Sequence, residues 1–178
     1  MNSSSPPPRA QVRMSALSEE GPSFDIRPMT DRPALEAVLR QRWSDGGVFV
    51  RGRMIRPQEV EAFGAYLDDR LQGVASWRVE DGVFYMLTLN NLTDQRGVAT
   101  ALLDHMLAVA RAQGFASMRV VISNDNWPAL RFYQKRGFAL AELHVGVVDV
   151  MRREMPSIPE RGVEGIPMRD EFELEIAL

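Results

Sequence analysis

The strongest constraint on the fold is a strand–turn–helix–strand pattern in residues 83–123. Residues 83–91 are β-rich, Gly97 stands in a turn, and residues 118–123 are again β-rich. The residues between carry apolar side chains at helical spacing, up to Gln113 with Gly114 as a C-terminal cap: Ala99, Leu102, Leu103, Met106, Leu107 and Ala110. The pattern predicts a helix that crosses between two strands of one sheet.

Three strand-like runs end with the first strand of that unit. Residues 64–67, 71–79 and 83–91 are separated by short polar turns, which predicts an antiparallel meander. The third run is apolar on both faces, so we expect it near the centre of the sheet. Together these features predict the α/β class, with a mixed, largely antiparallel central sheet and flanking helices.

The remaining elements are predicted around this centre. Residues 24–28 read as a strand followed by a helix, and residues 43–60 as a long loop or broken helix. Residues 139–145 read as a strand and 146–155 as a short amphipathic helix. The chain ends in a predicted strand over residues 172–178, where alternating glutamates are expected to form a solvated acidic face.

Length and composition predict one domain and exclude several function classes. The 178 residues, 45% of them hydrophobic, suit a single domain over residues 24–178 preceded by a flexible tail over 1–23. A net charge of −3 without a basic block argues against nucleic acid binding. No apolar run could span a membrane and no signal peptide is visible, so we expect a cytoplasmic location. We also expect a monomer or a homodimer.

Cysteine is absent, and the two histidines, His105 and His144, do not form an H-x-x-x-H pair. We therefore expect no metal and no cysteinyl intermediate in any acyl transfer.

A second informative stretch covers residues 124–138. Asn126 is a suitable N-cap, Pro128 fits only the first turn, and Gly137 suits the residue after the last turn, which predicts a helix over residues 127–136. Asn126 and Tyr133 are two turns apart and project to one side, while Phe132 is expected to point elsewhere into packing.

The start of the crossover helix offers a candidate pyrophosphate cradle, because free amides and the helix dipole favour an anion there. Gly97 would let the anion approach the backbone, within a segment made of Gln95, Arg96, Gly97, Val98, Ala99 and Thr100. The alternative interpretation is an ordinary helix that Asp94 caps.

Both stretches together resemble the GNAT superfamily of N-acetyltransferases. That family's cofactor loop, Q/R-x-x-G-x-G/A, is matched by Gly97 and Ala99 but not by Asp94. Its later motif, N-x-x-A-x-x-F-Y-x-K-x-G-F, is met at every fixed position: Asn126, Ala129, Phe132, Tyr133, Lys135, Gly137 and Phe138. The resemblance covers nearly all of the chain except the tail and implies the GNAT-like acyl-CoA N-acyltransferase fold.

The resemblance implies that an amine attacks the thioester of acetyl-CoA directly, without a covalent enzyme intermediate. Tyr133 would protonate the departing sulfur, and Asn126 would bind near the thioester. The backbone of Leu87 and Leu89 would pair with pantetheine, and Gln95 to Thr100 would hold the pyrophosphate. The acceptor would be a primary amine on a small molecule or peptide.

The acceptor side is the part that the sequence leaves open. Arg51 and Arg53, with Trp43, lie where the family binds the acceptor, although arginines in a loop are also commonly solvated. No general base is evident: turn chemistry explains Glu80 and Asp81, and a hydrogen-bonded structural role is expected for His144. Two rivals stay open, a catalytically degenerate acyl-CoA-binding protein and a nucleotide-binding βαβ protein of another class.

Overall fold

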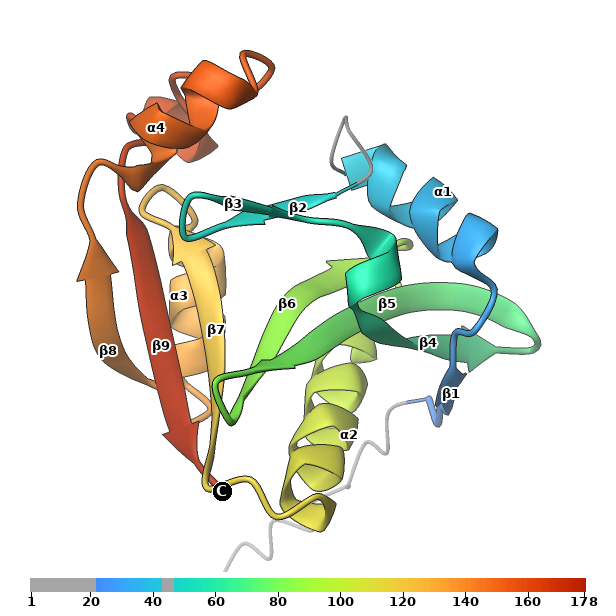
Figure 1. The fold of residues 1–178 in the computed structure, drawn as a ribbon. Helices are drawn as coiled ribbons and strands as arrows, with labels where there is room; N and C mark the ends of the chain where they lie inside the picture. The colour runs from blue at the N-terminus through green and yellow to red at the C-terminus, as the bar shows by residue number, and fades with distance from the viewer. Residues whose placement is uncertain (1–21, 43–46) are drawn as a thin grey trace, which may run out of the picture.

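The computed structural model describes residues 22–42 and 47–178. Trp43 and almost all of the tail predicted over residues 1–23 lie outside the described residues. A seven-stranded sheet organises the described chain, with strand order β1-β4-β5-β6-β7-β9-β8 (Figure 1). Its strands are β1 (Asp25–Pro28), β4 (Glu61–Leu67), β5 (Arg70–Glu80), β6 (Val83–Asn91), β7 (Ser117–Ser123), β9 (Glu171–Ala177) and β8 (Ala139–His144).

The sheet is mixed, as predicted, because β6 and β7 run parallel while every other neighbouring pair is antiparallel. Helix α2 (Val98–Ala112) makes the predicted crossover between these two strands. The meander β4–β5–β6 is confirmed, and β6 stands fourth of the seven strands, at the centre.

The parallel strands separate soon after they meet. Their pairing joins Phe84 to Met86 with Met118 to Val120 and then stops. On the other side of β6, Ser76 faces Thr88 while Trp77 faces Met86, so Leu87 is an extra, bulged residue. A bulge bends its strand and interrupts pairing, which opens the sheet at its centre.

The two faces of the sheet carry different layers (Figure 1). Helices α2 and α3 (Trp127–Gln134) cover one face, where Leu102, Leu103 and Met106 are fully buried. Helix α1 (Arg32–Arg42) and the hairpin β2 (Val48–Val50) and β3 (Arg53–Ile55) cover the other. Helix α4 (Val147–Glu154) packs beside the hairpin through Phe49, Val148 and Met151. No helix among the described residues is long and apolar enough to cross a membrane.

The prediction of a loop or broken helix over residues 43–60 is wrong for its described part. Residues 48–55 form the β2–β3 hairpin, and Pro57–Glu59 form a 3-10 turn. Arg51 and Gly52 occupy the tight turn with φ of 51° and 74°. Strands of three residues are too short to show an alternating pattern, which is why the hairpin could not be predicted from the sequence.

The predicted solvated acidic face of the last strand is also wrong. Glu171 and Glu173 are 4% and 0% exposed. Strand β9 is not at the edge of the sheet, because it lies between β7 and β8. Polar and apolar side chains do alternate along β9, but the buried glutamates on its polar face contact other polar groups instead of water.

Candidate active site

Three adjoining cavities follow one another along the N-terminus of α2 and into the opening between β6 and β7. The outermost, about 610 Å³, is lined by residues 91–97, Ala99, Thr100 and Phe132. It shares Asn91, Ala99 and Phe132 with a groove of about 380 Å³. That groove shares Leu89, Asn90, Asn126, Ala129 and Tyr133 with an inner cavity of about 230 Å³. We call these the cradle, the groove and the inner cavity.

The cradle has the geometry that an anion requires. Gly97 is the N-cap of α2 with φ of 89°, a left-handed conformation that a side chain would strain. The alternative interpretation placed Asp94 as the cap, but the N-cap residue of α2 is Gly97. Gln95, Arg96, Gly97, Ala99 and Thr100 all line the cradle, whereas the side chain of Val98 is fully buried beneath it. Asp94 lines the cradle as well.

Arg136 brings a cation to the border of the cradle. One of its guanidinium nitrogens donates to the Thr100 hydroxyl, and the group lies 3.7 Å from the centre of the Phe132 ring. Phe132 therefore does not simply point into packing, as predicted, but lines both the cradle and the groove.

Asn126 and Tyr133 face the same space, as the helical spacing predicts, since both line the groove and the inner cavity. The Asn126 Oδ1 caps α3 by accepting from the Ala129 amide at 3.2 Å, which leaves the amide NH2 to turn toward a ligand. Tyr133 is 6% exposed, and burial raises the pKa of its phenol, while nearby Arg136 opposes that rise. The hydroxyl therefore stays protonated at neutral pH.

Asn90 is a site residue that sequence reasoning missed. It lines the groove and the inner cavity, and its amide nitrogen is buried without a hydrogen-bond partner in the described structure. A buried unpaired donor is costly unless a ligand satisfies it. Its place three residues after the bulge could have singled it out, but the bulge itself leaves no trace in the sequence.

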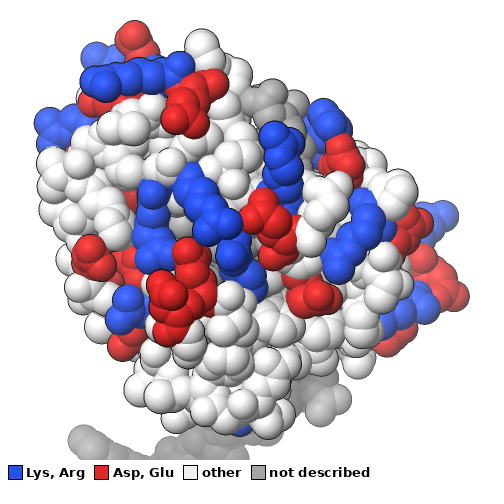
Figure 2. Space-filling view, viewed as in Figure 1, with Lys and Arg blue, Asp and Glu red and all other residues white. Residues whose placement is uncertain are grey.

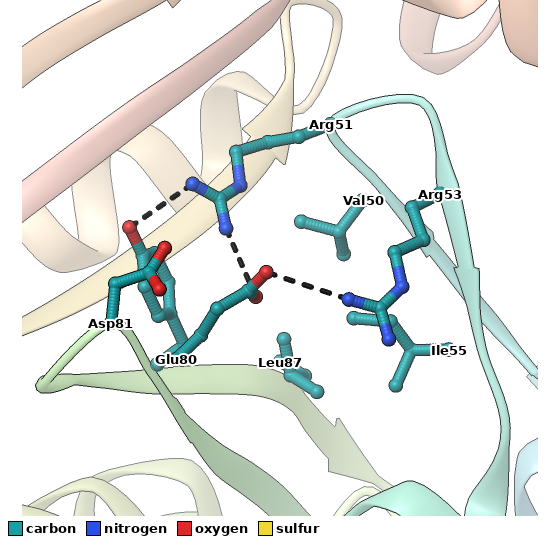
Figure 3. Close-up of a pocket in the computed structure, with 8 residues that line it drawn as sticks. Val50, Arg51, Arg53, Ile55, Glu80, Asp81 and Leu87 are labelled. Atoms are coloured by element: carbon teal, nitrogen blue, oxygen red, sulfur yellow. Dashed lines mark hydrogen bonds and ion pairs between the residues drawn. The ribbon is translucent and has the colours of Figure 1, made fainter.

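On the hairpin side the inner cavity adjoins an outer pocket of about 270 Å³, which shares Val50 and Leu87 with it (Figure 3). Arg51 and Arg53 line this pocket, as the acceptor hypothesis requires. Both pair with Glu80, at 3.0 and 3.5 Å, and Arg51 also donates to the Tyr85 hydroxyl at 3.2 Å. The two arginines are therefore not free cations awaiting an anionic substrate. Figure 2 shows basic and acidic side chains side by side over the centre of this face.

Behind Arg51 lies the polar network that replaces the expected solvated face. Glu173 accepts from Tyr85, Arg119 and His144 at 3.1, 2.8 and 3.0 Å. Burial alone would raise the pKa of Glu173, but these hydrogen bonds exceed that effect and lower it. His144 is thus hydrogen-bonded, as expected.

Glu171 differs from Glu173 because it reaches the inner cavity. Its Oε2 accepts from the backbone amide of Arg51 at 2.9 Å. Burial raises the pKa of its carboxyl, although the Arg51 amide and the charges of His144 and Arg51 oppose the rise. Sequence reasoning missed Glu171, because it treated the glutamates of this strand as solvated.

Three further polar or titratable side chains are held by neighbours within the fold. Thr88 lines the inner cavity, but its hydroxyl is hydrogen-bonded to that of Ser76 at 2.7 Å. His105 on α2 packs against Phe63 on β4 and lines none of the three cavities. Asp125 is 4% exposed and accepts from the Val163 amide, so it fastens the chain after α4.

Comparison with known proteins gives a consistent result. A family model described as "Acetyltransferase (GNAT) family" matches residues 24–138. The uncharacterized protein YxbD of Bacillus subtilis is 28% identical over 139 residues, which cover 78% of this chain and 87% of that protein.

Solved structures show the same fold. An IAA acetyltransferase from Bacillus cereus superposes with a TM-score of 0.65 at 18% identity, covering 88% of this chain and 100% of that one. A GNAT family acetyltransferase from Elizabethkingia anophelis, solved with acetyl-CoA bound, gives 0.65 at 15% identity and covers 87% and 98%.

Proposed function

The chain belongs to the GNAT acetyltransferase family, and from this premise we propose that it moves the acetyl group of acetyl-CoA to a primary amine by direct attack. Family membership confirms the expected enzyme class, an acetyl-CoA-dependent N-acetyltransferase, and removes the alternative of a nucleotide-binding protein of another class. The direct mechanism, the residues and the acceptor are our proposals.

The observation that carries the proposal is the row of adjoining cavities from the N-terminus of α2 to Tyr133. A CoA thioester needs an anion site at one end, an extended groove, and a proton donor at the other end. The chain offers these three features in that order.

The cradle would bind the pyrophosphate. Amides at the start of α2 point outward and the helix dipole favours negative charge, while Gly97 allows close approach. Arg136 beside Thr100 supplies a cation that offsets the nearby carboxylate of Asp94.

The groove would bind pantetheine. After Met86, β6 no longer pairs with β7, so backbone groups near Leu87 and Leu89 on that edge are available to a ligand that lies between the strands. The buried side-chain amide of Asn90 and the NH2 of Asn126 would donate hydrogen bonds to the carbonyl oxygens of pantetheine.

Tyr133 would act as general acid. Its burial keeps the phenol protonated, so it can donate to the thiolate as the carbon–sulfur bond breaks. Thiols have pKa values of about 8.5, so the thiolate is a fair leaving group and Tyr133 accelerates a step that proceeds slowly without it.

The test is release of free CoA thiol with a panel of amines, combined with thermal unfolding in the presence of acetyl-CoA. We expect acetyl-CoA to raise the melting temperature and at least one amine to stimulate thiol release. A thermal shift without release for any amine would favour the degenerate binder, and no shift at saturating acetyl-CoA would contradict the cofactor site itself.

A further inference from the structure

Resting on the proposed function, we propose that the acceptor is a primary amine with an apolar body. Glu171 receives its ammonium group, and the body lies against the apolar wall of the inner cavity. The wall joins the hairpin to α4 and the chain that follows it, through Phe49, Val148, Met151, Met155, Ile158 and Met168.

The inner cavity is larger than the acetyl group alone requires. The cavity of about 230 Å³ is more than twice the volume of an acetyl group, whose two carbons and one oxygen each occupy a water's share, about 30 Å³. Three methionines on the wall give it an adaptable, unbranched surface that fits apolar groups of different shape.

Glu171 is the one charged side chain among the described residues that line this cavity. It is 4% exposed, and the Arg51 amide fixes one carboxylate oxygen. The Arg51 amide and the charges of His144 and Arg51 offset the burial of this carboxylate only in part, so a further cationic partner would stabilise it. An ammonium group on an apolar body supplies that cation, whereas a longer acyl chain would bring no charge to Glu171.

Glu171 and Tyr133 line the same cavity, so the thioester carbon would lie between a base and an acid. The ammonium gives one proton to Glu171, and the free amine then attacks the carbonyl carbon. The carbon–nitrogen bond forms and the carbon–sulfur bond breaks as Tyr133 protonates the sulfur. The nitrogen gives up its second proton, which restores Tyr133, and the proton on Glu171 passes to solvent. The products are an amide, CoA thiol and one proton.

The decisive comparison uses two acceptors of equal length, n-pentylamine and 1,5-diaminopentane, with the full chain and acetyl-CoA. The diamine places a second charge against the methionine wall, where nothing neutralises it. We expect kcat/KM for pentylamine to exceed that for the diamine by on the order of 100-fold. Equal values, or a preference for the diamine or for a lysine peptide, would overturn the proposal.

Two substitutions on adjacent positions of α4 locate the body of the acceptor. Met151→Gln should raise KM for pentylamine about tenfold with KM for acetyl-CoA unchanged, because it places an amide in the apolar wall. The matched control is Val150→Gln, since Val150 is 48% exposed and does not line the cavity. Met168→Gln, at a half-buried wall position, repeats the test if Met151→Gln does not fold.

Hexanoyl-CoA separates an acceptor site from an acyl site. If it is used faster than acetyl-CoA, and Met151→Gln removes that advantage, the wall binds acyl chains and our assignment is wrong. Failure of the acceptor proposal leaves the thermal shift by acetyl-CoA and thiol release intact. Failure of the proposed function removes thiol release with every amine, and failure of the cofactor site removes the thermal shift as well.

Discussion

The donor half and the acceptor half of the site are built in different ways. The donor half, formed by the cradle and the groove, comes from residues 89–100 and 126–133, and its important groups are backbone amides, a glycine and small polar side chains. The acceptor half combines side chains from β2, β6, α4 and β9, elements that together span more than 100 residues of the sequence. In our proposal, the first half would hold its ligand with local backbone geometry, and the second with side chains that only the tertiary fold brings together.

The halves also differ in charge. The proposed anion site is at the open N-terminal end of a helix, whereas behind the proposed acceptor site the buried carboxylate of Glu173 accepts hydrogen bonds from arginine, tyrosine and histidine. Changes in the donor half should therefore affect cofactor binding. Changes in the acceptor half should affect turnover, specificity and the dependence on pH.

The largest effect is expected for Glu171→Gln, which removes the proposed base without changing shape. We expect kcat/KM to fall about 1,000-fold, within the range of general base catalysis, while acetyl-CoA affinity stays within twofold. Steady-state kinetics and calorimetric titration measure the two quantities. Glu175→Gln, on the same strand but outside the inner cavity, is the control and should stay within threefold of the wild type in kcat/KM.

If Glu171 is the base, the plot of kcat/KM against pH should fall on its acid side. Burial raises the Glu171 pKa above its ordinary value of 4.5, against the opposing influence of Arg51 and His144 and with the support of Glu173. Because the base must be ionised, activity should rise with pH through this raised value. An acid limb that persists unchanged in Glu171→Gln would contradict the assignment.

Gly97→Ala tests the donor half. A methyl group at φ of 89° strains the start of α2 and narrows the approach to its amides, so we expect acetyl-CoA affinity to fall about 30-fold. Gly114→Ala is a close control, because Gly114 has φ of 81° at the opposite end of the same helix. Both variants should lose about 1 kcal/mol of stability, and only the first should lose affinity. Equal affinities would mean that the cradle is not the cofactor site.

Tyr133→Phe should lower kcat about tenfold and leave acetyl-CoA affinity almost unchanged, since only the leaving thiolate loses its proton donor. Pre-steady-state thiol release measures the step directly. Tyr66→Phe, on β4 beside Arg27, controls for loss of a tyrosine hydroxyl elsewhere. A fall in affinity without a fall in kcat would place Tyr133 in binding rather than in proton transfer.

The smallest effect concerns stability and belongs to Glu173. Its pKa is lowered in the folded protein, so it stabilises the fold above its unfolded pKa, and that contribution is lost as pH falls through the folded value. Glu173→Gln should therefore cost about 1 kcal/mol at neutral pH, with the difference shrinking in acid. Thermal unfolding from neutral to acidic pH, with exposed Glu154→Gln as control, checks the sign. A cost that grows in acid would contradict it.

The donor half could be predicted from the sequence to a much greater extent than the acceptor half. Gly97, Asn126 and Tyr133 lie in segments where a cap, a turn and helical spacing fix the geometry within a few residues, so their positions could be inferred. The meander was inferred from three β-rich runs separated by short polar turns, and the crossover from helical periodicity.

The acceptor half depends on information that no local pattern holds. The alternation of Glu171 and Glu173 with apolar residues showed two distinct faces, but whether the polar face meets water depends on which strands flank β9 and on what covers it. Asn90 lines the groove and the inner cavity three residues after the bulged Leu87, and the β2–β3 hairpin was too short to show a period. These are properties of long-range pairing.

The most direct test is a crystal structure of the full chain with bound CoA. We expect the pyrophosphate on the amides at the start of α2, pantetheine between β6 and β7, and the sulfur within about 4 Å of the Tyr133 hydroxyl, close enough for proton transfer. The side of the sulfur nearer Glu171 should remain open to an acceptor. CoA bound elsewhere, or a sulfur that lies away from the inner cavity, would contradict the account.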